Sequence, residues 1–500
     1  MTVHEPGTGT NVPADLNPPL VWQLFQAISR IPRCSKKEQK ICAWIKAWAK
    51  QRTIPCRSDR TGNLLLRRAA SPGRERVPVL VLQAHLDMVC VKSEGVRFDF
   101  DNDPIPIRVD GANVRAEGTT LGADNGIGVA YCLAALIDPQ AQCGPLEVLL
   151  TVDEEEGGTG ALGLKAGFFS GRYLLNLDSE ETGIITIGTA GLEITDFKFP
   201  LRLKKASGCT ALSLIIRGLA GGHSGMDIHL PRGNAIKLVS AALNKLGEQL
   251  PVRLGRFDGG EAANSIPANA ECIVLVPEEA QARALAVLEQ WRRETLTRAR
   301  DIDPGLEISI QPDNAKKAFS IEETDTIRRL LTEIPHGALA FSKDIEGLVE
   351  SSNNLARVRS NKNIFEITVS YRSSVESSLE ELGAEMKSRG ERHGARIKQH
   401  SRAPGWTAKP GSPFSRMVQK HYGEVLDRPV ELKAFHAGLE CGIFTGIAPD
   451  LRMASIGPDI HSVHTPQEHA DIPSVALVWA VLRRIIAAMG ELPETGDADE

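Results

Sequence analysis

The sequence has 500 residues, which is too long for one compact domain when a domain averages about 150 residues. Hydrophobic residues make up 42% of the chain and charged residues 24%, so a sizeable core can form without a metal or a disulfide framework. The net charge is −5 and acidic and basic residues are interleaved, which argues against the basic face of a nucleic-acid-binding protein.

Targeting signals are not evident in the sequence. No run approaches the ~20 consecutive apolar residues that cross a bilayer, and the amino-terminal segment lacks the apolar stretch of a secretory signal. The nine cysteines are scattered and form no CxxC pair. We therefore expect a cytoplasmic protein with no membrane partner and with reduced structural thiols.

The elements predicted in chain order alternate between two types of region. Residues 1–15 and the acidic residues 492–500 are expected to be disordered tails. In residues 16–196, short apolar strands alternate with helices, and Ser35 to Glu38 predicts a capping box before a helix. Such alternation is typical of a doubly wound, mixed but largely parallel sheet covered on both faces.

The middle of the chain has a different pattern. In residues 197–400, predicted strands are separated by long amphipathic helices, which indicates an α+β domain. The α/β pattern then returns in residues 401–491. We therefore predict an α/β fold in which a doubly wound domain is interrupted by an inserted α+β domain.

Polar side chains follow several of the predicted buried strands. In an open α/β sheet, ligands bind outside the carboxyl ends of the strands, so these side chains should lie at one edge. Each has an ordinary explanation when taken alone, as a capping, loop or solvated residue. The residues are His85 and Asp87, Asp124 at the start of an apolar helix, Asp153 to Glu156, Asp178, and His461 and His464.

Together these residues predict a metal centre. Carboxylates gathered at one end of a buried sheet raise one another's pKa unless a cation neutralises them. Two histidines with three or four carboxylates suit Zn²⁺, Mn²⁺ or Co²⁺, and they would fill two adjacent sites better than one.

The same residues lie in motifs that resemble a known family. The motifs resemble those of the co-catalytic zinc peptidases of the glutamate carboxypeptidase and aminoacylase superfamily, and most closely the bacterial aminoacyl-histidine dipeptidases. The resemblance implies a zinc-exopeptidase-like catalytic domain with an inserted lid domain, and two divalent ions, Zn²⁺ before Mn²⁺ or Co²⁺. It also implies hydrolysis of dipeptides, notably Xaa-His including β-Ala-His. The motifs are HLD from His85, GTTLGADNGIG from Gly118, DEE from Asp153, NLDSEE from Asn176, GGHSG from Gly221 and HAGLECG from His436.

The resemblance also implies a role for each metal ligand. His85 and Asp178 would complete one metal site, Glu155 and His464 would complete the other, and Asp124 would bridge the two. Asp87 would hold the imidazole of His85 from outside the metal's ligands. His461 is the alternative to His464, because Val463 stands where close relatives often have proline.

Catalytic and substrate-binding roles follow from the same resemblance. Glu154 would be the general base for a water activated by the metals. His223, in the lid, would help to polarise the scissile carbonyl, and the lid could carry a homodimer interface. The small peptide substrate would be bound at its carboxylate by Arg372 and Asn264, and at its amino end by His436 and Glu440.

Other functions stay open from the sequence. Residues 158–163 match the G-x-G-x-x-G pattern of a nicotinamide-dependent oxidoreductase, but the four acids Asp153 to Glu156 before them would repel a pyrophosphate. A related amidohydrolase, with aminoacylase or carboxypeptidase-like activity, and a non-catalytic binding protein are further alternatives.

Overall fold

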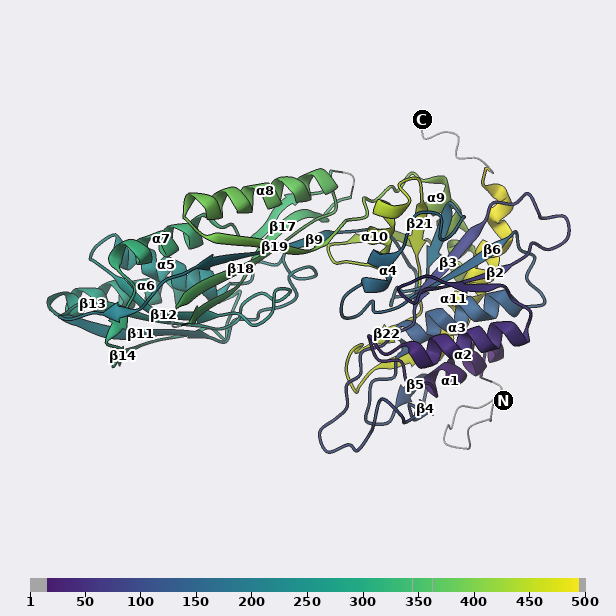
Figure 1. Ribbon diagram of the computed structural model, residues 1–500, viewed down its shortest axis with the longest axis horizontal. Coiled ribbons are helices and arrows are strands. Elements are labelled where there is room, and N and C mark those ends of the chain that lie inside the picture. The colour runs from purple at the N-terminus through teal and green to yellow at the C-terminus, as the bar shows by residue number, and fades with distance from the viewer. Residues whose placement is uncertain (1–15, 344, 362, 494–500) are drawn as a thin grey trace. The chain divides into compact units, whose positions relative to one another are not determined.

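The chain forms two compact units in the computed structural model, which describes residues 16–493 except 344 and 362 (Figure 1). Unit 1 contains the described residues up to Gly188, Ala408–Ala434 and those from Leu439 onward, and unit 2 contains Thr189–Thr407 and Phe435–Gly438. The limits drawn from the sequence at 197 and 400 fall inside strands of unit 2. The tails predicted at 1–15 and 492–500 lie outside the described residues, apart from 492 and 493.

A mixed eight-stranded sheet forms the centre of unit 1. Its order is β1-β2-β6-β3-β7-β21-β8-β20, and β6, β3, β7 and β21 run parallel to their neighbours within that group. This arrangement confirms the predicted α/β class with a parallel centre. The strands are β1 (Cys56–Ser58), β2 (Leu64–Arg68), β3 (Leu80–His85), β6 (Leu146–Thr151), β7 (Tyr173–Asn176), β8 (Ile184–Thr189), β20 (Glu431–Phe435) and β21 (Arg452–Ser455).

Apolar side chains at alternate positions of these strands pack against helices. Leu80, Leu82 and Ala84 of β3 point into one core with the apolar sides of α1, α2, α3, α9 and α11, while Val81 between them is buried on the opposite face. These helices, with the shorter ones of the unit, are α1 (Pro19–Ser29), α2 (Gln39–Gln51), α3 (Ala123–Ile137), α4 (Thr159–Gly163), α9 (Pro413–Leu426), α10 (Glu440–Ile447), α11 (Ile472–Ala488) and the 3₁₀ turn η2 (Met489–Glu491).

A small antiparallel sheet completes unit 1, in the order β22-β23-β5-β4. It places the segment that follows β21 beside the segment that precedes α3. Its strands are β4 (Ile107–Asp110), β5 (Asn113–Ala116), β22 (Ile460–His461) and β23 (His469–Asp471).

Unit 2 is an α+β domain built on one antiparallel nine-stranded sheet. The order is β14-β11-β13-β12-β17-β18-β9-β19, with β16 paired to β17, and α5 to α8 cover one face of it (Figure 1). The strands are β9 (Gly191–Phe199), β11 (Cys209–Arg217), β12 (Arg253–Gly259), β13 (Ala270–Pro277), β14 (Glu307–Asp313), β16 (Gly337–Phe341), β17 (Val349–Asn361), β18 (Ile364–Ser373) and β19 (Arg396–Ala403).

The helices of unit 2 bury an apolar side on that sheet. Phe365, Ile367, Val369 and Tyr371 alternate along β18 and are fully buried in the core beneath the helices. The remaining elements are α5 (Ala235–Gly247), α6 (Gln281–Ala299), α7 (Ile321–Glu333), α8 (Glu376–Arg392), the 3₁₀ turn η1 (Glu278–Ala280), and the two-stranded sheet of β10 (Lys204–Lys205) and β15 (Lys317–Ala318).

Among the described residues, one helical segment is long and apolar enough to cross a membrane by length and composition alone. It is Ile472–Glu491, with a mean hydropathy of 1.7. Its residues Val475, Val478, Leu482 and Ile485 are fully buried in the core of unit 1, where α11 packs against α9 and α3. Its apolar character is therefore that of a core helix.

The prediction that all cysteines are reduced is wrong for one pair. Cys34 and Cys90 form a disulfide across 56 positions of sequence. The segment after α1 runs beside the loop after β3, with a parallel bridge between Cys34 and Met88. No short-range spacing pattern could reveal this pair, because the fold alone brings the two segments together. The other seven cysteines are free.

The predicted capping box is also wrong. The Ser35 hydroxyl donates to Oδ2 of Asp87 at 2.8 Å, and α2 begins only at Gln39 without a side-chain cap. The Glu38 carboxylate instead accepts the backbone N–H groups of Lys36 and Asp153. Ser35 therefore binds Asp87, just after β3, instead of capping α2.

Candidate functional site

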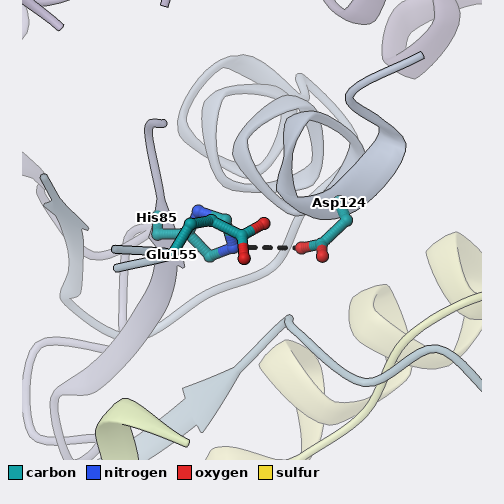
Figure 2. Close-up of side chains that lie close together, drawn as sticks. All are labelled: His85, Asp124 and Glu155. Carbon is teal, nitrogen blue, oxygen red and sulfur yellow. Dashed lines mark hydrogen bonds and ion pairs between the residues drawn. The ribbon is translucent and has the colours of Figure 1, made fainter. Parts of the chain in front are cut away.

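Three predicted ligands meet at the carboxyl ends of the parallel strands. One ligand atom from each of His85, Asp124 and Glu155 lies within 4.8 Å of the other two (Figure 2). His85 is the last residue of β3, Glu155 follows β6, and Asp124 lies in the first turn of α3 with non-helical backbone angles. Parallel strands bring these ends to one edge, which is why residues far apart in sequence converge.

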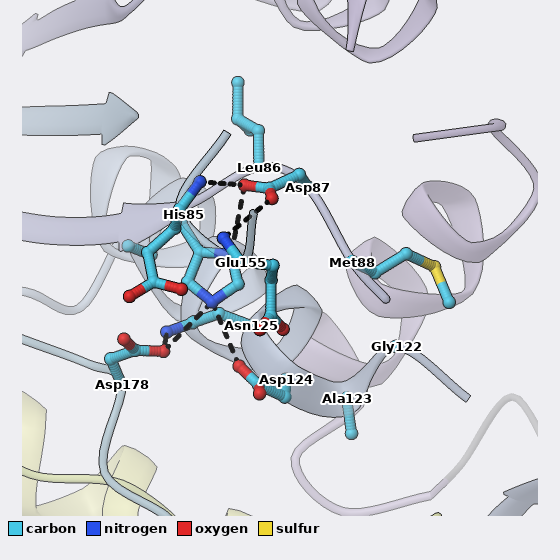
Figure 3. Close-up of polar contacts among 12 residues, drawn as sticks. His85, Leu86, Asp87, Met88, Gly122, Ala123, Asp124, Asn125, Glu155 and Asp178 are labelled. Atoms are coloured by element: carbon cyan, nitrogen blue, oxygen red, sulfur yellow. Dashed lines mark hydrogen bonds and ion pairs between the residues drawn. The ribbon is translucent and has the colours of Figure 1, made fainter. Parts of the chain in front are cut away.

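His85 contacts carboxylates on both sides of its ring. Its Nε2 lies 3.0 Å from Oδ1 of Asp124 and 3.3 Å from Oδ1 of Asp178, while its Nδ1 lies 3.4 Å from Oδ1 of Asp87 (Figure 3). Asp178 in turn accepts a hydrogen bond from the amide of Asn125. The imidazole is therefore oriented by Asp87, with Nε2 directed toward the two other carboxylates.

Asp87 also organises the loop that carries the acidic pair. Its carboxylate accepts the backbone N–H of Glu154 at 3.0 Å and that of Glu155 at 3.2 Å, and it is fully buried. Burial alone would raise the pKa of Asp87, but hydrogen bonds from His85, Glu154 and Ser35 lower it to about 2. Asp87 thus stays ionised and fixes the strand ends of β3 and β6 relative to each other.

Of the two carboxy-terminal histidines, His464 reaches the cluster. Its Nε2 lies 3.2 Å from Oδ2 of Asp124 and 3.0 Å from Oε2 of Glu155, and these hydrogen bonds raise the pKa of His464 to about 11. His461 packs its ring against His469, with centroids 5.1 Å apart. The geometry thus favours His464 as the ligand.

Glu154 differs from its neighbour Glu155. Within the described part of the chain its carboxylate forms no hydrogen bond or ion pair, whereas that of Glu155 faces His464. Burial raises the pKa of Glu154 well above its usual range, and Asp178 and Glu440 raise it further. A free carboxylate beside the ligand cluster suits proton transfer better than metal binding.

The donor set fits two divalent cations. Nε2 of each histidine points at carboxylates, and Asp124 offers one oxygen to His85 and the other to His464. Metal binding would displace the protons of both imidazoles, and the three ionised carboxylates would then carry a charge of −3, which two divalent ions would more than neutralise. Imidazole and carboxylate ligands together suit Zn²⁺, Mn²⁺ and Co²⁺.

The carboxylate of Glu440 binds side chains of the central strands rather than the proposed metal ligands. Its Oε2 accepts hydrogen bonds of 2.6 Å from both Gln83 and Thr151, and burial raises its pKa to about 7. The amide nitrogen of Asn176 donates to Oε1 of Gln83, and Oδ1 of Asn176 accepts the Ser455 hydroxyl and the backbone N–H of Asp178. This placement favours a supporting role for Glu440 over contact with a substrate ammonium.

In unit 2, backbone contacts fix the tautomer of His223. Its Nδ1 accepts the N–H groups of Gly225 at 3.3 Å and Met226 at 3.1 Å. Burial and the nearby Arg372 lower the pKa of His223, so the ring is neutral. Its Nε2 therefore carries the proton and can act as a donor to a carbonyl oxygen.

Arg372 lies near His223 and is buried without a counter-ion. It is 6% exposed, its Nε has no partner, and no ion pair joins it to any residue that the structure describes. Burial lowers its pKa to about 10, so the group stays charged at neutral pH. A buried, unpaired guanidinium is costly unless an anion binds there.

His436 and Asn264 lie in the same unit but in different surroundings. His436 is buried, its Nε2 lies 2.6 Å from the hydroxyl of Ser352, and burial and Arg372 lower its pKa to about 3. Ser352 is the cross-strand neighbour of Arg372. Asn264 is exposed, and its carbonyl accepts the N–H of Ser224 beside His223.

Two buried charged residues of the site were not found from the sequence. Glu468 accepts four backbone N–H groups of residues 121–124, and Arg33 donates to carbonyls of both loops that carry ligands. Glu468 lies four residues after the predicted ligand His464, and this proximity could have identified it from the sequence. Arg33 lies in a short loop after α1 and carries no local pattern.

Close packing explains two of the glycines in residues 158–163. A Cβ at Gly160 would lie 2.2 Å from the Val152 carbonyl oxygen, and one at Gly163 would lie 2.2 Å from Oγ1 of Thr61. The chain itself fills the space beside these glycines, which leaves the dinucleotide interpretation without support.

Comparison with known proteins agrees with this geometry. The family described as peptidase family M20/M25/M40 matches residues 81–488. The cytosol non-specific dipeptidase of Escherichia coli (strain K12) is 36% identical over 477 residues, covering 95% of this chain and 98% of that protein.

Solved structures share the fold. The aminoacylhistidine dipeptidase from Vibrio alginolyticus aligns with a TM-score of 0.89 at 36% identity, over 97% of this chain and 98% of that one. The aminopeptidase PepT from Bacillus cereus aligns with a TM-score of 0.55 at 16% identity, over 95% and 99%, and shows the fold alone. These findings confirm the resemblance predicted from the motifs.

Proposed function

Because the chain belongs to peptidase family M20/M25/M40, we propose that it is a metal-dependent dipeptidase that hydrolyses the peptide bond with two divalent ions, Zn²⁺ before Mn²⁺ or Co²⁺. The observation that carries this proposal is the convergence of two histidines and three carboxylates at the edge of the sheet, with Glu154 unpaired beside them. Dipeptidase is the activity named for both 36%-identical relatives.

The contacts suggest how the ligands divide between two ions. His85 and Asp178 would hold one ion, and Glu155 and His464 would hold the other. Asp124 contacts a histidine from each pair and is therefore the natural bridge. When bound, the ions would lower the pKa of a water and polarise the scissile carbonyl.

The chain's own residues would move the protons and orient the groups. Glu154 would take a proton from the attacking water and deliver it to the leaving amine, because its carboxylate has no competing partner. Asp87 would keep the ring of His85 in one orientation. His223, which carries its proton on Nε2, would donate to the carbonyl oxygen as negative charge develops there.

Unit 2 offers the chemistry for recognising the free carboxylate of a dipeptide. Arg372 supplies a buried cation that can bind a carboxylate with two parallel hydrogen bonds. Asn264 would contact the same end of the substrate, and neutral His436 would contact the amino side. Glu440 would support the site indirectly, by holding the side chains of Gln83 and Thr151.

Substrate range is the finer part of the proposal. One relative is named a non-specific dipeptidase and the other an aminoacylhistidine dipeptidase. We therefore propose that Xaa-His dipeptides, including β-Ala-His, are among the substrates and that other dipeptides are also cleaved. Cytoplasmic location and a homodimer through unit 2 complete the proposal, and light scattering of the purified protein tests the dimer.

Hydrolysis of a dipeptide panel tests the function. We expect cleavage of free dipeptides after loading with Zn²⁺ or Mn²⁺, loss of activity with a chelator, and poor cleavage of tripeptides and of carboxy-terminally amidated dipeptides. N-acetyl amino acids serve as the control for an aminoacylase. Cleavage of these, or of tripeptides as fast as dipeptides, would contradict the dipeptidase assignment.

A further inference from the structure

The carboxylate of Glu468 binds the backbone that leads into Asp124. Its Oε2 accepts the N–H groups of Leu121 at 2.8 Å and Gly122 at 2.9 Å, and its Oε1 accepts those of Ala123 at 2.7 Å and Asp124 at 3.3 Å. Glu468 is 2% exposed. Leu121 and Gly122 precede α3 and Ala123 and Asp124 lie in its first turn, so these N–H groups have no partner within the helix. One buried side chain therefore satisfies all four.

Glu468 also belongs to the segment that presents His464. Glu468 lies four positions after His464, and its N–H donates to the carbonyl of Thr465 at 3.1 Å, closing a turn after His464. Asp471, just beyond, is held in β23 beside β5. The side chain of Glu468 thus joins the backbone carrying one ligand to the backbone carrying another.

Arg33 holds the same segment from its other side. Its Nη1 donates to the carbonyl oxygens of Leu86 at 3.1 Å and Asp87 at 2.8 Å, and its Nη2 donates to that of Gly122. Arg33 is also 2% exposed. It therefore connects the loop that follows His85 to the loop that precedes Asp124.

The glycines of the GTTLGADNGIG motif make room for this guanidinium. A Cβ at Gly122 would lie 2.5 Å from Nη2 of Arg33, and a Cβ at Gly126 would lie 2.6 Å from it. Gly122 also has a φ of +68°, which side chains rarely adopt. The motif is therefore shaped by a residue almost 90 positions away, and the close packing leaves the loop little freedom.

We propose that Glu468 is a positioning residue that fixes Asp124 relative to His464, and that Arg33 fixes the same segment relative to His85. This inference rests on the proposed two-metal function. An ionised carboxylate can accept all four N–H groups, whereas a glutamine would turn an NH₂ group toward two of them. Loss of this contact would leave buried donors unsatisfied and let Asp124 shift relative to both histidines.

The test is the variant Glu468→Gln, compared with Glu147→Gln as a matched control. Glu147 is also buried and accepts the N–H groups of Ser170 and Gly171, but it lies at the amino end of β6, away from the ligands. Metal affinity of the apo-proteins is measured by Zn²⁺ titration against a chromophoric chelator, alongside unfolding temperature and dipeptide kinetics.

We expect Glu468→Gln to weaken Zn²⁺ binding by about 10–100-fold, the range for residues that orient metal ligands. Its kcat should fall while KM for a dipeptide stays within about twofold, because the substrate-recognition residues lie in unit 2. Glu147→Gln should lose thermal stability only. If Glu468→Gln matches Glu147→Gln in metal affinity and kcat, its role is structural and the inference is overturned.

A second variant covers the case in which Glu468→Gln does not fold. Glu468→Asp keeps the charge but draws the carboxylate back by one methylene, and we expect weaker Zn²⁺ binding with the fold retained. Unchanged binding in Glu468→Asp would also overturn the inference. The proposed function is tested separately, because wild-type protein that binds Zn²⁺ but cleaves no dipeptide would refute the activity and leave the positioning role standing.

Discussion

Nε2 of His464 lies 3.2 Å from Oδ2 of Asp124, although 340 positions separate them in the sequence. The other oxygen of Asp124 lies 3.0 Å from Nε2 of His85. One carboxylate therefore contacts both imidazoles of the cluster. Each imidazole has a second carboxylate beside it, Asp178 for His85 and Glu155 for His464.

This arrangement predicts unequal effects of ligand substitutions on metal content. Asp124→Ala should reduce bound Zn²⁺ from two ions per chain to fewer than one, because both sites lose a ligand. His464→Ala should chiefly weaken one ion and leave the other bound. Elemental analysis after reconstitution and desalting measures both, and His461→Ala is the matched control. Equal losses in Asp124→Ala and His464→Ala would argue against a bridging Asp124.

Glu154→Gln should separate catalysis from metal binding. The substitution keeps the size of the side chain but removes the basicity, so we expect kcat to fall by about 10²–10⁴-fold, the usual contribution of a general base. Metal content should stay normal, because the Glu154 carboxylate forms no hydrogen bond or ion pair with the proposed metal ligands. Glu155→Gln provides the contrast and should lose metal. Loss of metal in Glu154→Gln would mean that the two roles are exchanged.

The fold class and the identity of the clustered residues could be predicted from local patterns. His85, Glu155 and Asp178 follow apolar strands, and parallel strands end at one edge, so their convergence follows from topology. The choice of His464 over His461 followed from the His464-Thr465-Pro466 pattern of the resemblance, and the contacts of His464 with Asp124 and Glu155 favour the same choice.

The residues that could not be predicted are those whose role depends on a distant segment. Arg33 contacts Leu86, Asp87 and Gly122 through their backbone carbonyls, and a carbonyl leaves no signal in the sequence. Ser35 matches a capping pattern but donates to Asp87 instead. The disulfide of Cys34 and Cys90 belongs to the same contact between the segment after α1 and the loop after β3.

Arg372→Ala should weaken recognition of the free carboxylate. The buried guanidinium has no counter-ion among the described residues, so its loss should raise KM for a dipeptide by about 10–100-fold, with a smaller effect on the amide of the same dipeptide. Arg372→Lys keeps the charge but not the paired donors and should give an intermediate KM. Wild-type enzyme that cleaves the acid and the amide equally well would contradict this role.

His336 should make unit 2 less stable in acid. Burial and nearby Lys237 lower the pKa of His336 to about 4, below its ordinary value of 6.5. Between these values the unfolded chain binds a proton that the folded chain does not. Above pH 6.5 His336 therefore does not lower the free energy of unfolding. As the pH falls from 6.5 toward 4, the free energy of unfolding decreases by about 3 kcal/mol.

The variant His336→Gln tests this dependence. Glutamine can still accept a hydrogen bond from Asn234, which lies 3.3 Å from Nδ1 of His336, but it cannot be protonated. Thermal unfolding between pH 4 and 8 should show a flatter profile for the variant, with the two proteins converging toward the neutral end. Identical profiles for the two proteins would exclude His336 as the cause of the lower stability in acid.

Reduction of the Cys34–Cys90 disulfide should lower the stability of unit 1. The bond closes a loop across 56 positions, and in the chain-entropy model a loop of this size stabilises the folded state by about 4 kcal/mol. Both cysteines are partly exposed, so a thiol reductant can reach them. We expect a lower unfolding temperature with dithiothreitol or in Cys34→Ser, and no change in Cys42→Ser, which removes a free thiol. Thiol titration of the denatured, unreduced protein should find seven thiols, and nine would show that the bond is absent in solution.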